Sequence, residues 1–407
     1  MPETNSKSYS VAIVGAGLSG LCLAQGLLGA NVNVHVYERD ATPHARRQGY
    51  RITVDKDGLS ALKDCLPDQF FQVVLATASS TSEVGHFRFT NERLQDIFTL
   101  TFKPNPNDEV GLRPRQVDRQ MLRAILLSGL EGRVHFGKHV VGIETDNDGS
   151  TLLFADGSKC YASVVVGADG VNSPIRHHLL PNCPPLDLNA TAIYGRTQLR
   201  PDETLLPEQL EGTGVLALGT SPGDAFFFTT MLFQESPSVA FSHLPNKQPP
   251  PIETNYIMWA IICPQAHGIS DSLSQEALHR IALDACQAYH PVLVHFVESA
   301  DKASRVTLVG DAVHVMPPFG AYGGNTALKD AALLGQKLQA AIAQNKSLED
   351  AIGEYQREMV EYAFAQVDKA TSMMERLGMR NPIMRWVMLR VIPWIKRVIG
   401  SSLVLDE

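Results

Sequence analysis

Three glycines near the start of the chain have the spacing of a turn that binds a dinucleotide. Gly15, Gly17 and Gly20 follow the apolar run SVAIV, and Glu38 ends the next apolar run. Such glycines permit a tight strand-to-helix turn, and they let a pyrophosphate approach the N–H groups of a helix N-terminus. A terminal acid such as Glu38 accepts hydrogen bonds from the ribose of an adenosine. The pattern predicts dinucleotide binding, with a purely structural glycine turn as the alternative, and it does not distinguish FAD from NAD.

The segment around these glycines predicts a strand, a helix and a second strand. No residue between Lys7 and Glu38 is charged, but the glycines and two asparagines divide the stretch into VAIVGAG, LSGLCLAQGLLGA and VNVHVYE. We therefore expect a βαβ unit in a parallel sheet that helices cover on both faces, and not a membrane span. Further strands are expected over 134–166 and at 305–312.

Two later regions have a different texture. Alternating and aromatic-rich segments separated by Pro and Gly occupy about 187–262, which favours antiparallel sheet. After Ser347 the apolar residues recur at three- to five-residue spacing, which predicts one helix of about 30 residues. Such a helix is long enough to brace two domains.

Length and charge narrow the class of protein. The 407 residues are 44% apolar, carry a net charge of −8 and contain no basic arm, so we expect two domains, or one large domain with a second inserted into it, and no nucleic-acid partner. The six cysteines are scattered and no metal cluster is visible, and the first residues resemble no targeting peptide, so a cytoplasmic protein without a bound metal is expected. The tail over 382–400 is amphipathic. We expect it to pack on the protein, with peripheral membrane contact as the alternative.

Two further segments each place an Asp beside a Gly at the end of an expected strand. They are VVVGADGVNSPIR, with Asp169, and LVGDAVHVMPPFGAYGGNTALKDAALL, with Gly310 and Asp311. Together with GAGLSG they resemble the three fingerprints of the flavoprotein aromatic hydroxylase family, which includes para-hydroxybenzoate hydroxylase. The last segment is most similar to tetracycline-inactivating enzymes and to fungal and bacterial secondary-metabolite monooxygenases.

The resemblance implies a non-covalently bound FAD. Asp311 would accept a hydrogen bond from the ribityl chain, with a helix cap as its structural alternative, and His314 is expected to be a packed histidine. Arg119 would reach the ribityl and diphosphate region, whereas Arg113, Arg115 and Arg123 are expected on the surface. The full set of expected FAD-binding residues is Gly15, Gly17, Leu18, Ser19, Gly20, Glu38, Arg39, Arg46, Gly49, Arg119, Asp169, Gly310, Asp311, Pro318, Gly323, Gly324 and Asn325.

Two residues are expected to act nearer the reaction. Pro318 would fix a rigid loop that faces the flavin ring, because Pro cannot continue a strand. Arg196, at the expected sheet edge, would lie near the substrate, and a solvent-exposed strand arginine is the alternative. Some fungal relatives pair such an Arg with a later Tyr, but the segment DAFFFTTMLF contains none. An acid–base role for Arg196 is therefore not carried over.

The expected fold is an α/β flavoprotein with a doubly wound parallel sheet, an inserted, mainly antiparallel substrate domain and a long C-terminal helix. The FAD-binding domain would comprise 1–75, 105–185 and 295–345, and the substrate domain 76–104 and 186–294. Residues 346–407 would form the bracing helix and tail.

The function that the resemblance implies is oxygenation of an aromatic or polycyclic small molecule. The enzyme would use NAD(P)H and O2, through a flavin C4a-(hydro)peroxide, in secondary metabolism or xenobiotic modification. A flavin oxidase or dehydrogenase without oxygen insertion and a non-redox FAD-bound cyclase are the alternatives. Aromatic side chains at Phe226, Phe227, Phe228, Phe241 and Trp259 suggest an apolar substrate, although they also suit a core.

Overall fold

The computed structural model describes most of the chain. The described residues are 9–43, 45, 50–79, 85–102, 109–146, 148–182, 190–199, 214–221, 223–245, 249–250, 252, 254–264, 275–300, 322–344, 348–376, 386–391 and 404–406. The expected strand at 305–312 and the loop that follows it, with Gly310, Asp311, His314 and Pro318, lie outside these residues, as do Arg46 and Gly49.

A four-stranded parallel sheet forms the centre of the cofactor half, in the order β11-β1-β2-β7. Its strands are β1 (Ser10–Val14), β2 (Asn33–Glu38), β7 (Val134–Phe136) and β11 (Val164–Gly167). Helix α1 (Leu18–Gly29) connects β1 to β2, so the predicted βαβ unit is present. Val11 and Ile13 point into the main core around α1, whereas Ala12 and Val14 belong to a separate core on the other face.

The second face of this sheet is not covered by helices alone, which corrects the expectation. It packs against an antiparallel sheet of β8 (Val140–Thr145), β9 (Ser150–Phe154) and β10 (Lys159–Ala162), together with the short helix α5 (Pro174–Leu179). Leu152 and Phe154 of β9 and Ile175 of α5 share a core with Ala12 and Val14. The strands over 140–162 were expected from their sequence, but the apolar side chains of a strand do not show which sheet it packs against. The sequence pattern alone therefore did not identify β8–β10 as the layer that covers the parallel sheet.

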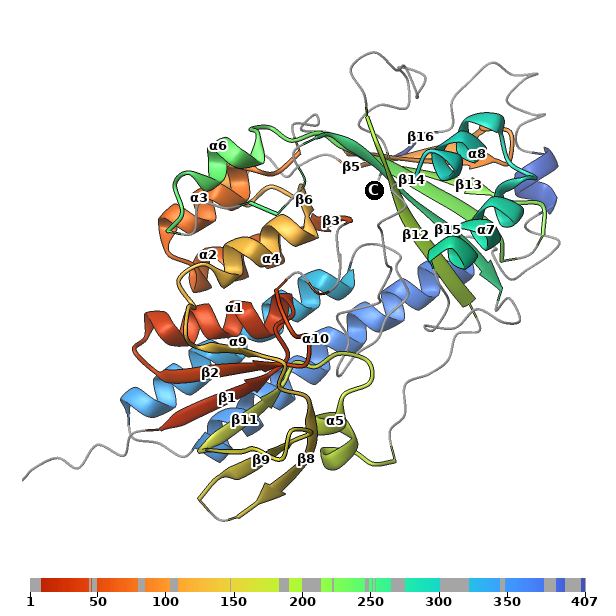
Figure 1. The fold of residues 1–407 in the computed structure, drawn as a ribbon. Coiled ribbons are helices and arrows are strands. Elements are labelled where there is room, and N and C mark those ends of the chain that lie inside the picture. The colour runs from red at the N-terminus through yellow and green to blue at the C-terminus, as the bar shows by residue number, and fades with distance from the viewer. Residues whose placement is uncertain are drawn as a thin grey trace, which may run out of the picture.

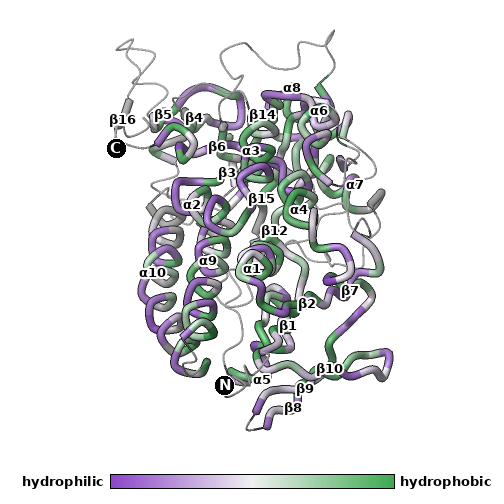
Figure 2. The backbone as a smooth tube through the Cα atoms, turned by 90° about the vertical axis from the view of Figure 1, so that its left-hand side faces the viewer, coloured by the Kyte–Doolittle hydropathy of each residue, from purple (hydrophilic) through white to green (hydrophobic). Residues whose placement is uncertain are grey.

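Helix α1 is apolar on all sides because it is buried on all sides. Figure 2 shows it near end-on in the middle of the molecule, with α9 (Tyr322–Ala343) between it and α10 (Leu348–Arg376). On its other sides lie α4 (Arg119–Leu127) and α2 (Lys56–Cys65), which leads into α3 (Asp68–Ala76). This burial explains the long uncharged stretch of sequence. Within the described residues, no helix is long and apolar enough to cross a membrane.

Helix α10 has 29 residues, close to the predicted length. It lies along α9, where Lys337 of α9 donates to Glu358 at 2.6 Å and to Glu354 at 3.3 Å. The hydroxyl of Tyr362 donates to Asp330 across the same pair of helices. These contacts tie α10 to the cofactor half, and its bracing of two domains stays a prediction.

The second half of the molecule is a seven-stranded, mainly antiparallel sheet in the order β12-β15-β14-β13-β4-β5-β16. Figure 1 shows it beside the cofactor half, with β3 (Arg51–Val54) and β6 (Arg115–Asp118) on the side that faces it. Its strands are β4 (Gly85–Asn91), β5 (Asp96–Phe102), β12 (Ala190–Gln198), β13 (Gly214–Leu218), β14 (Ala225–Met231), β15 (Tyr256–Pro264) and β16 (Val404–Asp406). Helices α7 (Gln275–Cys286) and α8 (Pro291–Glu298) cover its far face. The remaining short elements are η1 (Val110–Leu112) and α6 (Pro237–Phe241).

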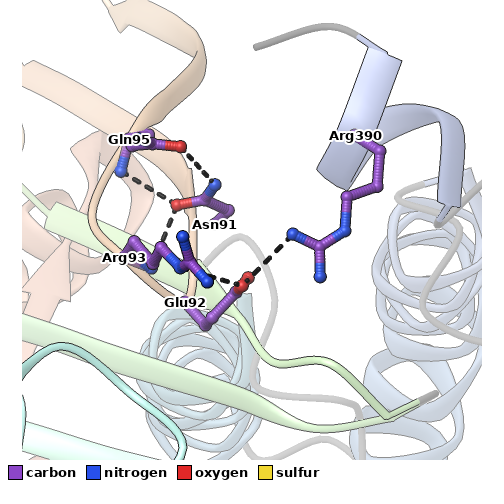
Figure 3. A network of polar contacts seen from close by, with 5 residues as sticks. All are labelled: Asn91, Glu92, Arg93, Gln95 and Arg390. Carbon is purple, nitrogen blue, oxygen red and sulfur yellow. Dashed lines mark hydrogen bonds and ion pairs between the residues drawn. The ribbon is translucent and has the colours of Figure 1, made fainter. Parts of the chain in front are cut away.

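The C-terminal part of the chain returns to this sheet. Trp386 is 61% exposed, while Arg390, in the π-helical turn Val387–Val391, reaches the β4–β5 hairpin. There its Nη1 atom donates to Glu92 Oε1 at 3.4 Å (Figure 3). Strand β16 then pairs in parallel with β5. The sequence around β16 has no periodic hydrophobic pattern, so its pairing with the edge of this sheet was not expected from the sequence.

Candidate active site

The glycine turn after β1 can be built only with glycines at two of its positions. Gly15 has φ +107°, and a β-carbon there would lie 2.3 Å from the carbonyl oxygen of Ala168. A β-carbon on Gly20 would lie 2.1 Å from the carbonyl oxygen of Gly15. The turn is thus pressed between α1 and the segment after β11, which joins two of the three fingerprint segments. This packing explains the glycines whether or not a ligand is bound.

The N-terminus of α1 has no ligand of its own within the described residues. Gly17 is the N-cap, no side chain caps the helix, and the first turn holds no acid. The first helical bond runs from the Leu21 N–H to the Gly17 carbonyl. The N–H groups of Leu18, Ser19 and Gly20 therefore lack intrahelical acceptors, as at any helix start. This arrangement fits the pyrophosphate of a dinucleotide, because the N–H groups and the helix dipole favour an anion.

The Glu38 carboxylate binds the backbone of the glycine turn and lies at the end of β2, where the ribose is expected. Its Oε2 accepts from the Ala16 N–H at 2.8 Å, and its Oε1 accepts from the Asp40 N–H at 2.9 Å. The side chain is buried at 7% exposure. Each carboxylate oxygen has two lone pairs, so an acid at this position can bind backbone N–H groups and also accept from a ribose hydroxyl. Arg39 beside it is exposed.

Arg123 was expected on the surface, and the structure shows this expectation to be wrong. Its Nε donates to the Ala16 carbonyl at 2.8 Å, its Nη1 donates to the Pro43 carbonyl at 2.7 Å, and the residue is 8% exposed. Arg123 thus fastens the glycine turn to the segment after β2. A guanidinium can be buried where backbone carbonyls accept its hydrogen bonds. Arg119 is also buried, at 4% exposure, and opens α4.

Asp169 lies directly behind the glycine turn. Within the described residues, no group meets hydrogen-bonding geometry with either of its buried carboxylate oxygens. Burial is the main cause that raises the pKa of Asp169, and the nearby Ser173 side chain and Arg176 charge oppose it only in part. Ser173 caps α5 by accepting from the Arg176 N–H, so it is a buried structural residue and not a solvated one. A buried carboxyl whose charge the protein compensates only in part is the kind of group that a bound ligand would satisfy.

The start of α9 brings the third fingerprint segment to the same region. Gly323, Gly324 and Asn325 lie in its first turn, as predicted. The Asn325 side chain is committed to the protein, because its Oδ1 accepts from the Asp55 N–H and its Nδ2 donates to the Thr53 carbonyl, both at 3.0 Å. A β-carbon on Gly324 would find no neighbour within 4 Å, so the backbone there is open to approach. At these three positions the helix start is therefore able to meet a ligand through backbone N–H groups and not through the Asn325 side chain.

The sheet face that looks toward the cofactor half carries Arg196. Arg196 stands opposite Met258 in the register of β12 and β15, and its guanidinium lies 5.6 Å from the centroid of the Tyr256 ring. The Tyr256 hydroxyl donates to Asp118 Oδ2 at 2.5 Å. Burial is the main cause that raises the pKa of both Tyr256 and Asp118. The structure thus gives Arg196 a tyrosine neighbour on β15, where the sequence search looked only at β14.

Tyr256 and Asp118 were missed by the sequence reasoning. Asp118 Oδ1 accepts from the Gln120 and Met121 N–H groups and caps α4, so its hydrogen bond to Tyr256 links the two halves of the molecule. An Asp before a helix is an ordinary capping signal. That Asp118 also meets a tyrosine depends on how β15 packs against the start of α4, and this packing cannot be predicted from the sequence pattern.

Most of the expected aromatic wall is core. Phe226, Phe228 and Trp259 point to the far face of the seven-stranded sheet and pack under α7 and α8, and Phe241 packs in the main core. Phe227 points to the face with Arg196 and is only partly buried. Tyr194 lies on that face too, stacked on Tyr50 with ring centroids 5.1 Å apart. Of the five expected residues, Phe227 therefore remains on the face available to a ligand, together with Tyr194, which was not expected there.

Comparison with known proteins bears on this arrangement. The family model described as FAD binding domain matches residues 8–184 and 268–370. A dual O-methyltransferase/FAD-dependent monooxygenase of Cercospora beticola is 29% identical over 374 residues, covering 82% of this chain and 42% of that protein. The chain thus spans less than half the length of this curated relative.

Two further relatives match along most of their length. An FAD-dependent monooxygenase of Trichoderma harzianum is 25% identical over 424 residues, covering 94% of this chain and 97% of that protein. A crystal structure named as an FAD-containing monooxygenase from Photorhabdus luminescens superposes with a TM-score of 0.71 at 30% identity, covering 92% of this chain and 99% of that one. The predicted α/β fold and the resemblance to FAD monooxygenases are confirmed. Since the family model spans both the glycine turn and the start of α9, the chain belongs to the FAD-binding domain family and its cofactor is FAD.

Proposed function

We propose that this chain is an FAD-dependent monooxygenase that uses NAD(P)H and O2 to oxygenate an aromatic or polycyclic small molecule. The observation that carries the proposal is the position of Arg196. It stands on a sheet face opposite the elements that build the FAD site, next to a buried tyrosine that is hydrogen-bonded to the cap of α4. The names of the relatives support the same activity.

The proposal assigns the chain to domains as the sequence suggests. Residues 1–75, 105–185 and 295–345 would bind FAD, 76–104 and 186–294 would bind substrate, and 346–407 would form the bracing helix and tail. The membership of β4, β5 and β12 to β15 in one sheet supports the middle assignment. Strand β16 joins that sheet from the tail.

When bound, FAD supplies the acceptor for a hydride and the site where O2 is activated. The N–H groups at the start of α1 would hold its pyrophosphate, and Glu38 its adenosine ribose. Asp169 would lie on the pyrophosphate side and Arg119 at the ribityl and diphosphate region. Asp311 and the backbone of Gly323 and Gly324 would hold the ribityl chain and the flavin ring, with Pro318 in the loop that faces the ring. Arg196 and the partly exposed Phe227 and Tyr194 would orient the substrate and exclude water from it.

The test is the fate of the oxygen atom. Purified protein reconstituted with FAD is given NAD(P)H and isotopically labelled O2 with a panel of aromatic and polycyclic compounds, and products are analysed by mass spectrometry. One labelled oxygen atom per NAD(P)H consumed is expected in the product. A substrate that is oxidised without incorporating label would identify an oxidase or dehydrogenase. A substrate rearranged without any NAD(P)H consumption would identify a non-redox cyclase.

A further inference from the structure

Asp118 is a fully buried carboxylate whose two oxygens are bound by different halves of the molecule. It ends β6, on the side of the cofactor half that faces the seven-stranded sheet (Figure 1). Its Oδ1 caps α4 by accepting from the Gln120 and Met121 N–H groups at 2.8 and 3.0 Å. Its Oδ2 accepts from the Tyr256 hydroxyl of β15 at 2.5 Å. A helix cap needs only the first of these oxygens, so capping does not account for the bond to the tyrosine.

The tyrosine at the other end of this bond is fixed in place by its surroundings. Tyr256 is buried at the start of β15, which pairs with β12 on one side and with β14 on the other. Its ring packs in the main core, edge-on to Phe233 with ring centroids 6.4 Å apart. A strand that is paired on both sides cannot shift alone. The Tyr256 hydroxyl therefore has a fixed position relative to the seven-stranded sheet.

The start of α4, on the other side of the bond, carries two arginines that lie toward the cofactor site. Arg119 follows Asp118 as the first residue of the helix, and its N–H donates to the Tyr50 carbonyl at 3.1 Å. One turn later, Arg123 donates to the Ala16 carbonyl in the glycine turn at 2.8 Å. Both side chains are buried, so packing gives them little freedom to compensate for a displaced helix. The orientation of α4 therefore decides where both guanidiniums lie.

The surroundings of Asp118 suit a residue that acts through its neighbours. It is fully buried, and its oxygens already accept three hydrogen bonds from the protein. Burial is the main cause that raises the pKa of Asp118, and the hydrogen bond from Tyr256 is the largest effect that opposes it, ahead of the Met121 N–H and the Arg196 charge. The tyrosine thus stabilises the ionised carboxylate, which is the form that best accepts from the N–H groups of α4.

We propose that Asp118 is a positioning residue that ties the start of α4 to the seven-stranded sheet, so that Tyr256 sets the position of Arg119 at the cofactor. In this arrangement neither Tyr256 nor Asp118 touches FAD. The inference rests on the role in FAD binding that the proposed function gives to Arg119. It goes further, because it makes a hydroxyl on the sheet half of the molecule a determinant of FAD affinity.

Tyr256→Phe tests the proposal because it removes only the hydroxyl. Tyr289→Phe is the matched control, since Tyr289 is another buried tyrosine but packs in the core on the far face of the same sheet. The FAD affinity of each full-length apoprotein is measured by fluorescence titration. Tyr256→Phe is expected to weaken FAD binding at least about fivefold, which is the effect of one ordinary hydrogen bond. Tyr289→Phe should leave the affinity unchanged.

A double-mutant cycle with Arg119→Ala shows whether the effect of the hydroxyl passes through Arg119. In the Arg119→Ala background, Tyr256→Phe should weaken FAD binding by less than about twofold, because the contact that it positions is already lost. The visible circular dichroism of the bound flavin, recorded at saturating FAD, is the second measurement. Tyr256→Phe should change this spectrum in the same direction as Arg119→Ala does, which a tyrosine that only stabilises the fold would not do.

Asp118→Ser separates the two tasks of the carboxylate. Serine is also a good N-cap residue, so α4 keeps its cap, but its side chain has no second oxygen for the Tyr256 hydroxyl. Asp118→Ser should therefore reproduce the loss of FAD affinity that Tyr256→Phe causes, and the two substitutions combined should cause little further loss.

The proposal is overturned if Tyr256→Phe or Asp118→Ser keeps the FAD affinity of the wild type, or if Tyr256→Phe leaves the flavin dichroism unchanged. It is also overturned if Tyr256→Phe weakens binding equally in the Arg119→Ala background, or if Tyr289→Phe weakens it as much. Wild-type affinity in Arg119→Ala would overturn it too, because Asp118 would then have no FAD contact to position. None of these measurements involves oxygen transfer, so a failure of the proposed monooxygenase activity would not affect them.

Discussion

Glu38 shows how one carboxylate can serve both the protein and its cofactor. It binds the N–H groups of Ala16 and Asp40 and lies at the end of β2, where the ribose is expected. Glu38→Ala should weaken FAD binding roughly tenfold or more, because charge-assisted hydrogen bonds are worth about 1.5–3 kcal/mol each. It should also lower the melting temperature of the apoprotein, since two buried N–H groups lose their acceptor.

Fluorescence titration of FAD and thermal melting of the apoprotein measure the two effects of Glu38→Ala separately. Glu38→Gln keeps an acceptor oxygen and should fall between the wild type and the alanine variant in both. Unchanged FAD affinity in Glu38→Ala would restrict Glu38 to its structural contacts.

Asp169 should make stability depend on pH in an identifiable window. Its pKa is raised in the folded state, so the folded protein binds a proton more readily than the unfolded chain does. The carboxylate therefore costs stability once the pH exceeds the unfolded value of about 3.9, and the cost is complete above the folded pKa. Asp169→Asn should raise the apoprotein melting temperature at neutral pH, and the gain should vanish below about pH 3.9. A gain that is the same at both pH values would assign it to something other than the charge.

Helix α4 carries two arginines, Arg119 and Arg123, that are expected to have different roles. Arg123 is fixed to the Ala16 and Pro43 carbonyls, whereas Arg119, one turn earlier, is the residue expected to reach FAD. Arg123→Ala should chiefly lower the stability of the apoprotein. Arg119→Ala should chiefly lower FAD affinity. Melting of the apoprotein and equilibrium FAD binding distinguish the two, and equal effects of both variants in both measurements would remove the proposed register of α4 against the cofactor.

The C-terminal turn around Arg390 compensates a buried charge on another element. Glu92 is 4% exposed, and Arg390 from the tail donates to it (Figure 3). Arg390→Ala should destabilise the protein by about 1–3 kcal/mol, because a buried charged acceptor loses its donor. Glu92→Gln should reduce that loss, which a double-mutant cycle from denaturant melts measures. Additive effects of the two substitutions would mean that the ion pair contributes nothing.

The helices and strands differ in how well their sequence patterns predicted them. The βαβ unit, the antiparallel region and α10 have periodic patterns that only one kind of element satisfies, and they were predicted correctly. The β8–β10 layer over the parallel sheet and the returning strand β16 were not, because sheet membership depends on partners distant in sequence. The same holds for the site. The glycine turn is local, whereas the meeting of Asp118, Arg196 and Tyr256 requires both the register of β12 with β15 and the packing of β15 against the start of α4.

At the scale of the whole molecule, the source of electrons is the open functional question. Beyond the turn at Gly15 to Gly20, the sequence contains no second strand, glycine turn and helix for NAD(P)H. We expect that NAD(P)H docks transiently and reduces the flavin directly. Under anaerobic conditions, NADPH or NADH should bleach the flavin of the isolated holoenzyme, and faster with substrate bound. Stopped-flow absorbance measures this. A flavin that stays oxidised, in a protein that turns over only when reduced FAD is supplied, would require a separate reductase.

The central position of α1 has a consequence for how the protein is made. This apolar helix leaves the ribosome well before α9, which packs along it but follows about 300 residues later in the chain. At roughly 5–20 residues per second, α1 must wait about 15–60 s for that neighbour. During this time an almost entirely apolar helix lacks one of its covering surfaces, which favours chaperone binding or aggregation. The hydrogen bonds of Asn325 to Thr53 and Asp55 form equally late. The FAD site can therefore be completed only after α9 has been synthesised, so the cofactor binds late in the assembly of this fold.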